Sequence, residues 1–205
     1  MLRLAAFSCL LACWSAAAAQ GSCNAYFPAQ PGWVWTYQVT SQGKAQPATT
    51  TRFEVSGDTL TAINGQHKTK YRCRAGALTS LTPPTIGGAT LTRAAVTGVH
   101  LPAAAEWKVG HTWKQVWALE GRRGPLSGKG TLTTSYRIIA QEKVRVPAGE
   151  FTAFKVSAQT QVTGQAIGMN MNQDLGTASL WYAKGTGLVK MQQPGYESVL
   201  VRLQK

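Results

Sequence analysis

The residues that most often carry catalysis are few in this sequence, and their spacing matches no common catalytic motif. The three histidines are His67, His100 and His111, and none accompanies a Gly-x-Ser-x-Gly nucleophile pattern. Eight carboxylates are scattered along the chain, so the fold would have to bring two together before they could act as a glycosidase pair. The sequence also lacks a phosphate-binding glycine loop and a dinucleotide fingerprint. We therefore expect no catalytic residues, no cofactor and no enzymatic activity, with an unrecognised hydrolase as the remote alternative.

Two methionines at alternate positions, Met169 and Met171, are the nearest approach to a metal site. Thioether sulfurs are ligands for soft ions such as Cu(I). Methionines also fill gaps in apolar surfaces or cover the mouth of a pocket. We favour the second interpretation and expect no metal.

The segment HKTKYRCR, residues 67–74, is the clearest candidate for a charged binding surface. On a strand, alternate side chains point to opposite faces, so one face would carry the basic row, which comprises Lys68, Lys70, Arg72 and Arg74. Specific binding of nucleic acid is not expected, because Tyr71 would point away from the cations and could not stack on a base beside them. An anionic membrane surface or an acidic envelope polymer needs only the charge. The alternative is a solvated face that discourages pairing between sheet edges.

The elements that must position these residues are short strands separated by glycine-rich turns. Alternation of apolar and polar residues and β-branched content predict strands at 33–40, 49–56, 59–63, 67–74, 77–81, 89–97, 111–119, 129–146, 151–162, 177–183, 188–192 and 197–203. Asn64-Gly65 is a strong hairpin signal directly before the basic row. Helical signal is confined to 102–107, with Pro102 at its start. The glycine-rich segments 120–130 and 164–176 predict long loops at the rim of the sheet.

This pattern predicts an all-β fold with minor helix, in which about ten antiparallel strands form a strongly curved sheet or an open, incomplete β-barrel. One face of every strand would line an apolar interior, which is either roomy enough for a lipid-like ligand or packed solid. The aromatic side chains expected to line this interior are Trp33, Trp35, Tyr37, Trp113, Trp117 and Tyr136.

Residues 1–19 predict a cleaved secretory signal peptide, which leaves residues 20–205 as a single β domain. A short positive start is followed by an apolar run at 4–14 and by small residues with an Ala-x-Ala pattern before Gln20. The alternative is a lipid anchor at Cys13, because residues 10–13 resemble a lipobox. We therefore expect an exported protein, periplasmic or extracellular. Its formal net charge of +13 favours nonspecific attraction to anionic partners and also solubility.

Removal of the signal peptide would leave two of the four cysteines, Cys23 and Cys73. Two cysteines in an oxidising compartment usually pair, so we expect a disulfide between them. A zinc site is not expected, because no second pair of ligands lies nearby at zinc-like spacing.

Four phrases of the remaining chain combine aromatic residues with turn residues. They are YFP with GWVWTY at 26–37, VGHTW at 109–113, VRVPAGEF at 144–151 and WYAKGTGLVK at 181–190. In this order and spacing they resemble a bacterial family of exported β-domains of unknown function, itself distantly similar to the periplasmic lipoprotein-carrier (LolA/LolB-like) fold. The resemblance implies a curved antiparallel sheet, an envelope role and a hydrophobic ligand, and it supplies no catalytic residues.

We therefore expect a monomeric, noncatalytic binding protein for a lipid or another hydrophobic or amphiphilic envelope molecule. The alternative is an anion-binding or structural envelope protein that uses the basic row.

Overall fold

The computed structural model describes residues 23–85, 88–166 and 169–205, so the predicted signal peptide and Cys13 lie outside the described residues. The described chain consists of strands joined by turns, with one short 3₁₀ helix. In chain order the elements are β1 (Val34–Ser41), β2 (Lys44–Ala45), β3 (Thr49–Ser56), β4 (Thr59–Asn64), β5 (His67–Arg74), β6 (Ala77–Ser80), β7 (Thr90–Gly98), η1 (Ala104–Glu106), β8 (Thr112–Arg123), β9 (Leu126–Val146), β10 (Gly149–Ala166), β11 (Met169–Ala183), β12 (Gly187–Gln193) and β13 (Tyr196–Gln204). No helix in these ranges has the length and apolarity that a membrane crossing demands.

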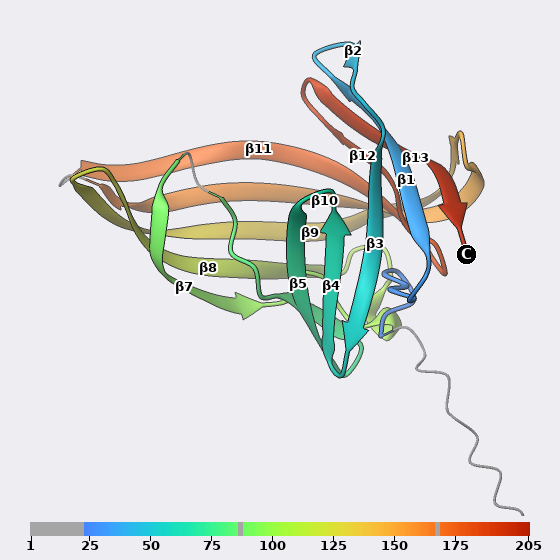
Figure 1. Ribbon diagram of the computed structural model, residues 1–205, viewed down its shortest axis with the longest axis horizontal. Coiled ribbons are helices and arrows are strands. Elements are labelled where there is room, and N and C mark those ends of the chain that lie inside the picture. The colour runs from blue at the N-terminus through green and yellow to red at the C-terminus, as the bar shows by residue number, and fades with distance from the viewer. Residues whose placement is uncertain (1–22, 86–87, 167–168) are drawn as a thin grey trace, which may run out of the picture.

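All thirteen strands join one sheet that curls almost into a barrel (Figure 1). Its order is β6-β5-β4-β3-β1-β13-β12-β11-β10-β9-β8-β7, with β2 added beside β1. The two ends of this path meet where the Leu78 amide donates to the Leu101 carbonyl at 2.9 Å and the His100 amide donates to the Leu78 carbonyl at 2.6 Å. The predicted fold class is confirmed, with thirteen strands where about ten were expected.

The strands differ greatly in length, and this difference shapes the molecule. Strand β9 has 21 residues and β4 has six, which correspond to about 70 Å and about 20 Å at the usual rise per residue. The short strands β3 to β5 therefore cover only part of the inner face of β8 to β11. The uncovered ends continue past the barrel as an extended arm, seen at the left of Figure 1. The arm comprises residues 89–94, 118–132, 160–166 and 169–176.

Two segments predicted as loops are strands of this arm, so that prediction was wrong. Residues 126–130 begin β9 and residues 120–123 end β8, while the described residues of 164–176 belong to β10 and β11. The ladder continues through them, with Gly130 paired to both Leu119 and Gly164. The alternation of apolar and polar residues is weak there because no other part of the described chain covers this part of the sheet. A Cβ atom on Gly130 would lie 2.8 Å from the Thr163 carbonyl oxygen, so glycine permits the close approach of the strands.

The interior of the barrel is a packed apolar core. Leu78, Ile138 and Val156 are fully buried in one cluster, and Val189 and Leu200 are fully buried in a second. Each such side chain contributes about 1.5–3 kcal/mol through burial. The core therefore fixes the curvature of the sheet from which the functional residues project.

The predicted disulfide is present and joins Cys23 to Cys73 on β5, with a Cα–Cα distance of 6.1 Å. It holds the N-terminal plug, residues 23–29, against the end of the barrel. Tyr26 belongs to the barrel core and stacks on Trp107 with ring centroids 4.0 Å apart. The plug is thus part of the core as well as tethered to it.

The buried side chain of Asn24 forms hydrogen bonds with backbone groups in and around the plug. The Asn24 side chain is 1% exposed, and its Nδ2 donates to the carbonyls of Gly76 and Pro102, both at 2.8 Å. Its Oδ1 accepts from the Tyr26 amide at 2.8 Å. The first two bonds join the plug to the β5–β6 turn and to the segment before η1, and the third orders the plug itself. The helix η1 lies where the sequence indicated a helical turn.

Candidate functional site

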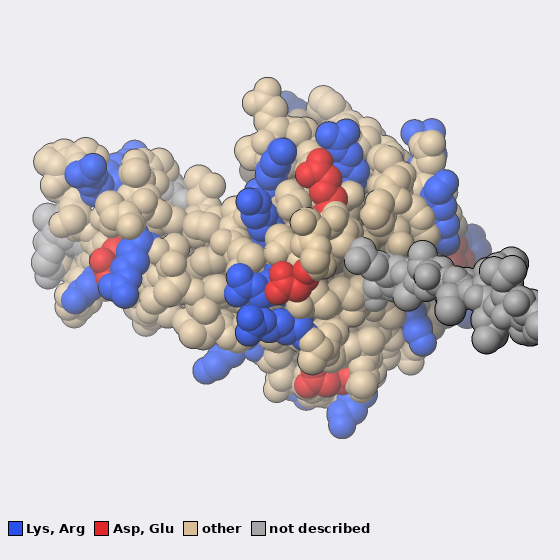
Figure 2. Space-filling view, turned by 60° about the horizontal axis from the view of Figure 1, so that its bottom comes forward, with Lys and Arg blue, Asp and Glu red and all other residues tan. Residues whose placement is uncertain are grey.

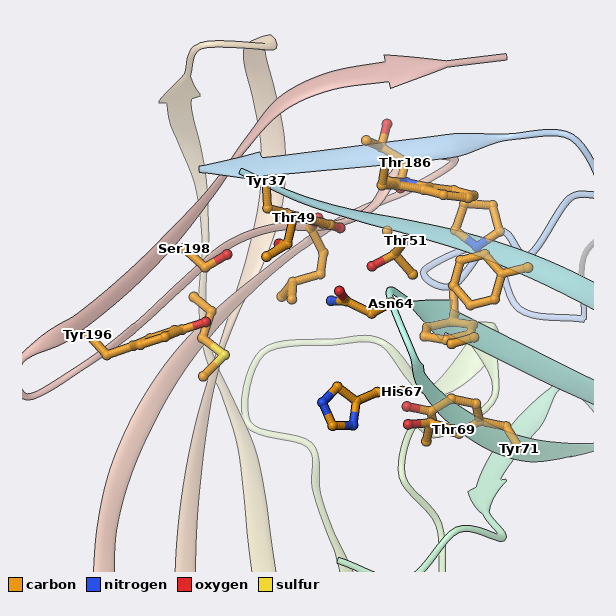
Figure 3. A pocket seen from close by; sticks show the side chains of 18 residues that line it. Tyr37, Thr49, Thr51, Asn64, His67, Thr69, Tyr71, Thr186, Tyr196 and Ser198 are labelled. Carbon is orange, nitrogen blue, oxygen red and sulfur yellow. The ribbon is translucent and has the colours of Figure 1, made fainter. Parts of the chain in front are cut away.

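A cavity of about 300 Å³ lies between the N-terminal plug, strands β1 and β3 to β5, and the β12–β13 pair (Figure 3). Strand alternation determines which side chains enter it. On β4, Ala62 and Asn64 face the cavity, and their cross-strand partners on β3 are Phe53 and Thr51. On β5 the same residues pair with Thr69 and His67, which therefore line the cavity too.

Aromatic rings form the floor of this cavity. Phe27 of the plug meets Phe53 edge-to-face at 5.0 Å and Tyr71 at 5.2 Å. Phe53 also meets Trp35 edge-to-face at 5.0 Å. Such offset contacts stabilise the arrangement beyond simple burial and leave a rigid apolar surface toward the open space.

Two of the aromatic residues already have hydrogen-bond partners within the protein. The Trp35 Nε1 donates to the Thr186 carbonyl at 2.7 Å, and the Tyr37 hydroxyl donates to the Leu188 carbonyl at 2.9 Å. Burial raises the pKa of Tyr37 well above its ordinary value and raises the pKa of Tyr71 to about 12. Both phenols are therefore neutral at physiological pH, and these residues offer ring surface to a ligand instead of charge.

The rest of the lining combines polar side chains with a few apolar ones, such as Leu188 and Met191. Figure 3 shows hydroxyl, amide and imidazole groups spread across the cavity from several segments. Besides Tyr37 and Tyr71, the polar side chains of the lining are Thr49, Thr51, Asn64, His67, Thr69, Thr186, Tyr196 and Ser198. None of the described residues that line the cavity is Lys, Arg, Asp or Glu. The cavity can therefore hold an apolar group against its floor and hydrogen-bond a polar group at its rim, without a fixed charge of its own.

The six aromatic residues predicted to line the interior fall into two groups. Trp35 and Tyr37 line the cavity. Trp113 and Tyr136 instead stack on one another at 5.0 Å inside the barrel, and Trp117 is 5% exposed on β8. Trp33 packs beside Trp35 at 5.8 Å, with the Lys205 ammonium over its ring at 4.7 Å. The structure thus brings together only two of the six at the cavity.

The histidines lie apart from carboxylates, with one exception among the described residues. Desolvation lowers the pKa of His100 to about 4, and its ring lies 5.2 Å from that of Tyr71. His111 contacts Glu106 at 3.9 Å outside the cavity. No group of three His, Cys, Asp or Glu residues in the described ranges is arranged to hold a metal ion. His67, the histidine of the cavity, has no carboxylate among the other lining residues.

The basic row lies on the outer face of β5, opposite the cavity. Lys68, Lys70, Arg72 and Arg74 are all exposed, while Tyr71 and Cys73 between them are half-buried. Arg72 forms an ion pair with Asp58 at 3.6 Å. Figure 2 shows further basic side chains on both the barrel and the arm of the face it displays, with few acidic ones.

The polar half of the cavity was not predicted from the sequence. His67 and Thr69 occupy the inward positions of the same segment whose outward positions form the basic row. Tyr196 and Ser198 repeat this spacing at the start of β13. The alternation that indicated the basic row could have identified them, because it assigns every second residue to the inner face.

The fold of the chain is similar to that of known proteins. No protein-family model matches it, and no curated protein matches its sequence. A Bacteroides fragilis protein, whose name describes it as exported and as having a YmcC-like fold, aligns with 89% of this chain and all of its own, at a TM-score of 0.51 and 15% identity. A Parabacteroides distasonis protein named as a lipoprotein aligns with 89% of this chain and 99% of its own, at a TM-score of 0.51 and 16% identity. The chain therefore shares its fold with these two proteins, while the more distant likeness to the lipoprotein-carrier fold stays a prediction.

Proposed function

We propose that this chain is an exported, noncatalytic binding protein that holds one hydrophobic or amphiphilic envelope molecule in the cavity beside the N-terminal plug. One observation carries the proposal. The cavity has an aromatic floor and a polar rim in which no described residue is Lys, Arg, Asp or Glu, and both are built on strands tied to the barrel core. Largely preformed apolar clefts with a few polar groups are typical of small-molecule sites.

Export has independent support. The Cys23–Cys73 disulfide suits an oxidising compartment, and residues 1–19 have the pattern of a secretory signal. The two proteins that share the fold are named as an exported protein and a lipoprotein. An envelope location gives such a cavity access to lipids and other amphiphiles.

The chemistry of the cavity limits the ligand to a molecule with a compact apolar part and a neutral polar part. Phe27, Phe53 and Tyr71 would contact the apolar part. Asn64 and Thr69 would donate or accept hydrogen bonds at the rim. A strongly anionic headgroup would gain no ion pair from the lining residues, so the basic row on the opposite face is not needed for this function.

The direct test is native mass spectrometry of protein purified from its own envelope fraction, compared with spectra under denaturing conditions. We expect a lipid-sized mass that is released on denaturation. The variant Ala62→Phe places a ring directly in the cavity, opposite Phe53, and should abolish the extra mass. Thr61→Phe puts the same ring on the outer face of the same strand and is the matched control. A bare wild-type chain, or an extra mass that survives Ala62→Phe, would contradict the proposal.

The second candidate function uses the basic row as an anion-binding surface. The observation that favours it is the exposure of four cations on one face of β5, of which Arg72 is paired with Asp58. An acidic polysaccharide or an anionic lipid surface would meet that face without involving the cavity.

A further inference from the structure

The arm carries a groove on its inner face, separate from the cavity. The groove has a volume of about 440 Å³, and its apolar side chains include Leu91, Leu119, Leu132, Val162 and Met171. These residues come from five neighbouring strands, β7 to β11. Among the described residues, the groove and the cavity share no lining residue.

Exposed apolar side chains are concentrated on the same arm. Six large hydrophobic residues of the described chain are strongly exposed, and four of them belong to the arm: Leu126 at 45%, Met169 at 65%, Met171 at 42% and Leu175 at 51%. The other two, Val109 and Ile139, lie singly elsewhere. Isolated exposed apolar residues need no explanation, but a cluster of them marks a contact surface.

Cations accompany this apolar cluster. The arm contains four Arg or Lys residues and two carboxylates, which gives it a formal charge of +2. Glu120 pairs with Arg93 at 3.7 Å, and Arg122, Arg123 and Lys129 line the groove. Figure 2 shows this gathering of basic side chains at the far end of the molecule.

The other acidic residue of the arm is bonded within the protein. Asp174 accepts from the Gly176 amide at 2.8 Å and from the Gln159 Nε2 at 3.2 Å. Neither carboxylate of the arm pairs with the three cations of the groove among the described residues. Those cations can therefore meet an external anion.

We propose that the arm docks onto an anionic membrane surface. Leu126, Met169 and Met171 would enter the boundary between headgroups and acyl chains, and Arg122 and Arg123 would contact lipid phosphates. An apolar edge flanked by cations has the composition of a surface that lies in the membrane interface. This proposal does not depend on the cavity, because the two regions are built from different residues.

Two other partners fit the arm less well. A second copy of the chain in a twofold contact would set the same cations against one another, because such an interface is self-complementary. Single-stranded nucleic acid would require aromatic side chains for stacking, and the described residues of the arm include none. A lipid surface satisfies the apolar and the cationic groups at once.

The test is co-sedimentation of the purified chain with vesicles of phosphatidylglycerol mixed with phosphatidylcholine, and with vesicles of phosphatidylcholine alone. We expect salt-sensitive binding to the anionic vesicles. Leu126→Asn combined with Met169→Asn should weaken the partition by about tenfold or more. The matched control, Val109→Asn combined with Ile139→Asn, makes the same kind of change at exposed apolar residues outside the arm and should bind as the wild type does.

A second pair of variants separates the cations of the arm from other exposed cations. Arg122→Gln with Arg123→Gln should weaken binding to anionic vesicles by about tenfold or more, while Lys108→Gln with Lys114→Gln, at exposed residues outside the arm and the basic row, should leave it near the wild-type level. The proposal is overturned if the wild type does not bind the vesicles, or if the arm variants bind as well as their controls. A concentration-dependent dimer that only the arm variants lose would also overturn it, in favour of self-association. Thermal melting verifies that every variant is folded.

Discussion

Removal of the Cys23–Cys73 disulfide is the perturbation whose effect follows most directly from the structure. The bond closes a loop across a sequence separation of 50 residues. In the chain-entropy model a loop of this length stabilises the folded state by about 4 kcal/mol, because the cross-link restricts the unfolded chain. We expect the Cys23→Ala/Cys73→Ala variant to lose about that much free energy of unfolding.

The folded state of this variant should stay close to that of the wild type. The plug keeps the Asn24 bonds to Gly76 and Pro102 and the stacking of Tyr26 on Trp107. Asn24→Ala is the complementary change, because it keeps the disulfide and leaves the carbonyls of Gly76 and Pro102 without this donor. It should lower the free energy of unfolding by about 1–3 kcal/mol and act on the folded state.

The assay is urea denaturation followed by tryptophan fluorescence, with the wild type measured both oxidised and reduced. Reduction of the wild type should reproduce the double-alanine variant, since both remove only the cross-link. Phe27 and Tyr71 form part of the cavity floor, and because the folded state keeps their packing, the affinity of the folded variant for a cavity ligand should stay close to that of the wild type. A loss below about 1 kcal/mol in the double variant would refute the reasoning and indicate that the plug is already ordered in the unfolded chain.

Three further predictions concern pH, charge and backbone packing. The pKa of His100 falls from 6.5 to about 4 on folding. Its contribution to the free energy of unfolding should therefore be complete above pH 6.5 and be lost as the pH falls toward 4, a change of about 3 kcal/mol. Curves of the free energy of unfolding against pH for the wild type and His100→Gln should differ in slope only across that range. Neutralising all four residues of the basic row to Gln should abolish binding to heparin at moderate salt if the row is an anion site, and unchanged binding would identify it as a solvated face. Gly130→Ala should destabilise the arm by about 1–3 kcal/mol, because the added Cβ meets the Thr163 carbonyl; hydrogen exchange of the β9–β10 amides measures this, and unchanged protection would contradict it.

Strand positions could be predicted well where a second layer covers the sheet. On β3, Phe53 and Val55 alternate with Arg52 and Glu54, and the burial of the strand alternates in the same way. Here the alternation of apolar and polar residues directly indicates which face of the strand is half-buried and which is exposed. The predicted boundaries of β3 and β5 coincide with those observed, and among all the strands only the two-residue β2 was not predicted.

The arm could not be predicted in the same way, because no apolar layer formed by the described residues lies opposite its strands. Gly128 and Gly130 on β9 face inward at positions where a covered strand would carry large side chains. Their pairing is held by backbone hydrogen bonds, which leave no pattern in the side chains. Glycine content then indicates a loop, although the backbone is extended and paired.

The cavity could be predicted only in part, for a related reason. Trp35 and Trp113 have the same residue type and both point inward, yet one lines open space and the other is packed against Tyr136. The two residues differ in the distance from their strand to the opposite side of the barrel. This distance depends on how far the sheet curls before β6 meets the segment after β7. Local sequence defines the inward face of each strand, whereas closure of the sheet decides whether that face is filled.

The long strands β8 to β10 pass through both environments, and their inner face changes accordingly. Trp113 and Tyr136 pack in the closed part, whereas Leu132 and Val162 line the open groove. Between them lies a polar row formed by Gln115, Thr134 and Thr160, in which the two threonine hydroxyls are 3.2 Å apart. This polar row lies between two apolar ones, at the boundary between the covered and the uncovered part of the inner face. Since the cavity and the groove lie apart and share no lining residue, a variant that fills the cavity should leave vesicle binding unchanged, and a variant of the arm should leave the ligand in place.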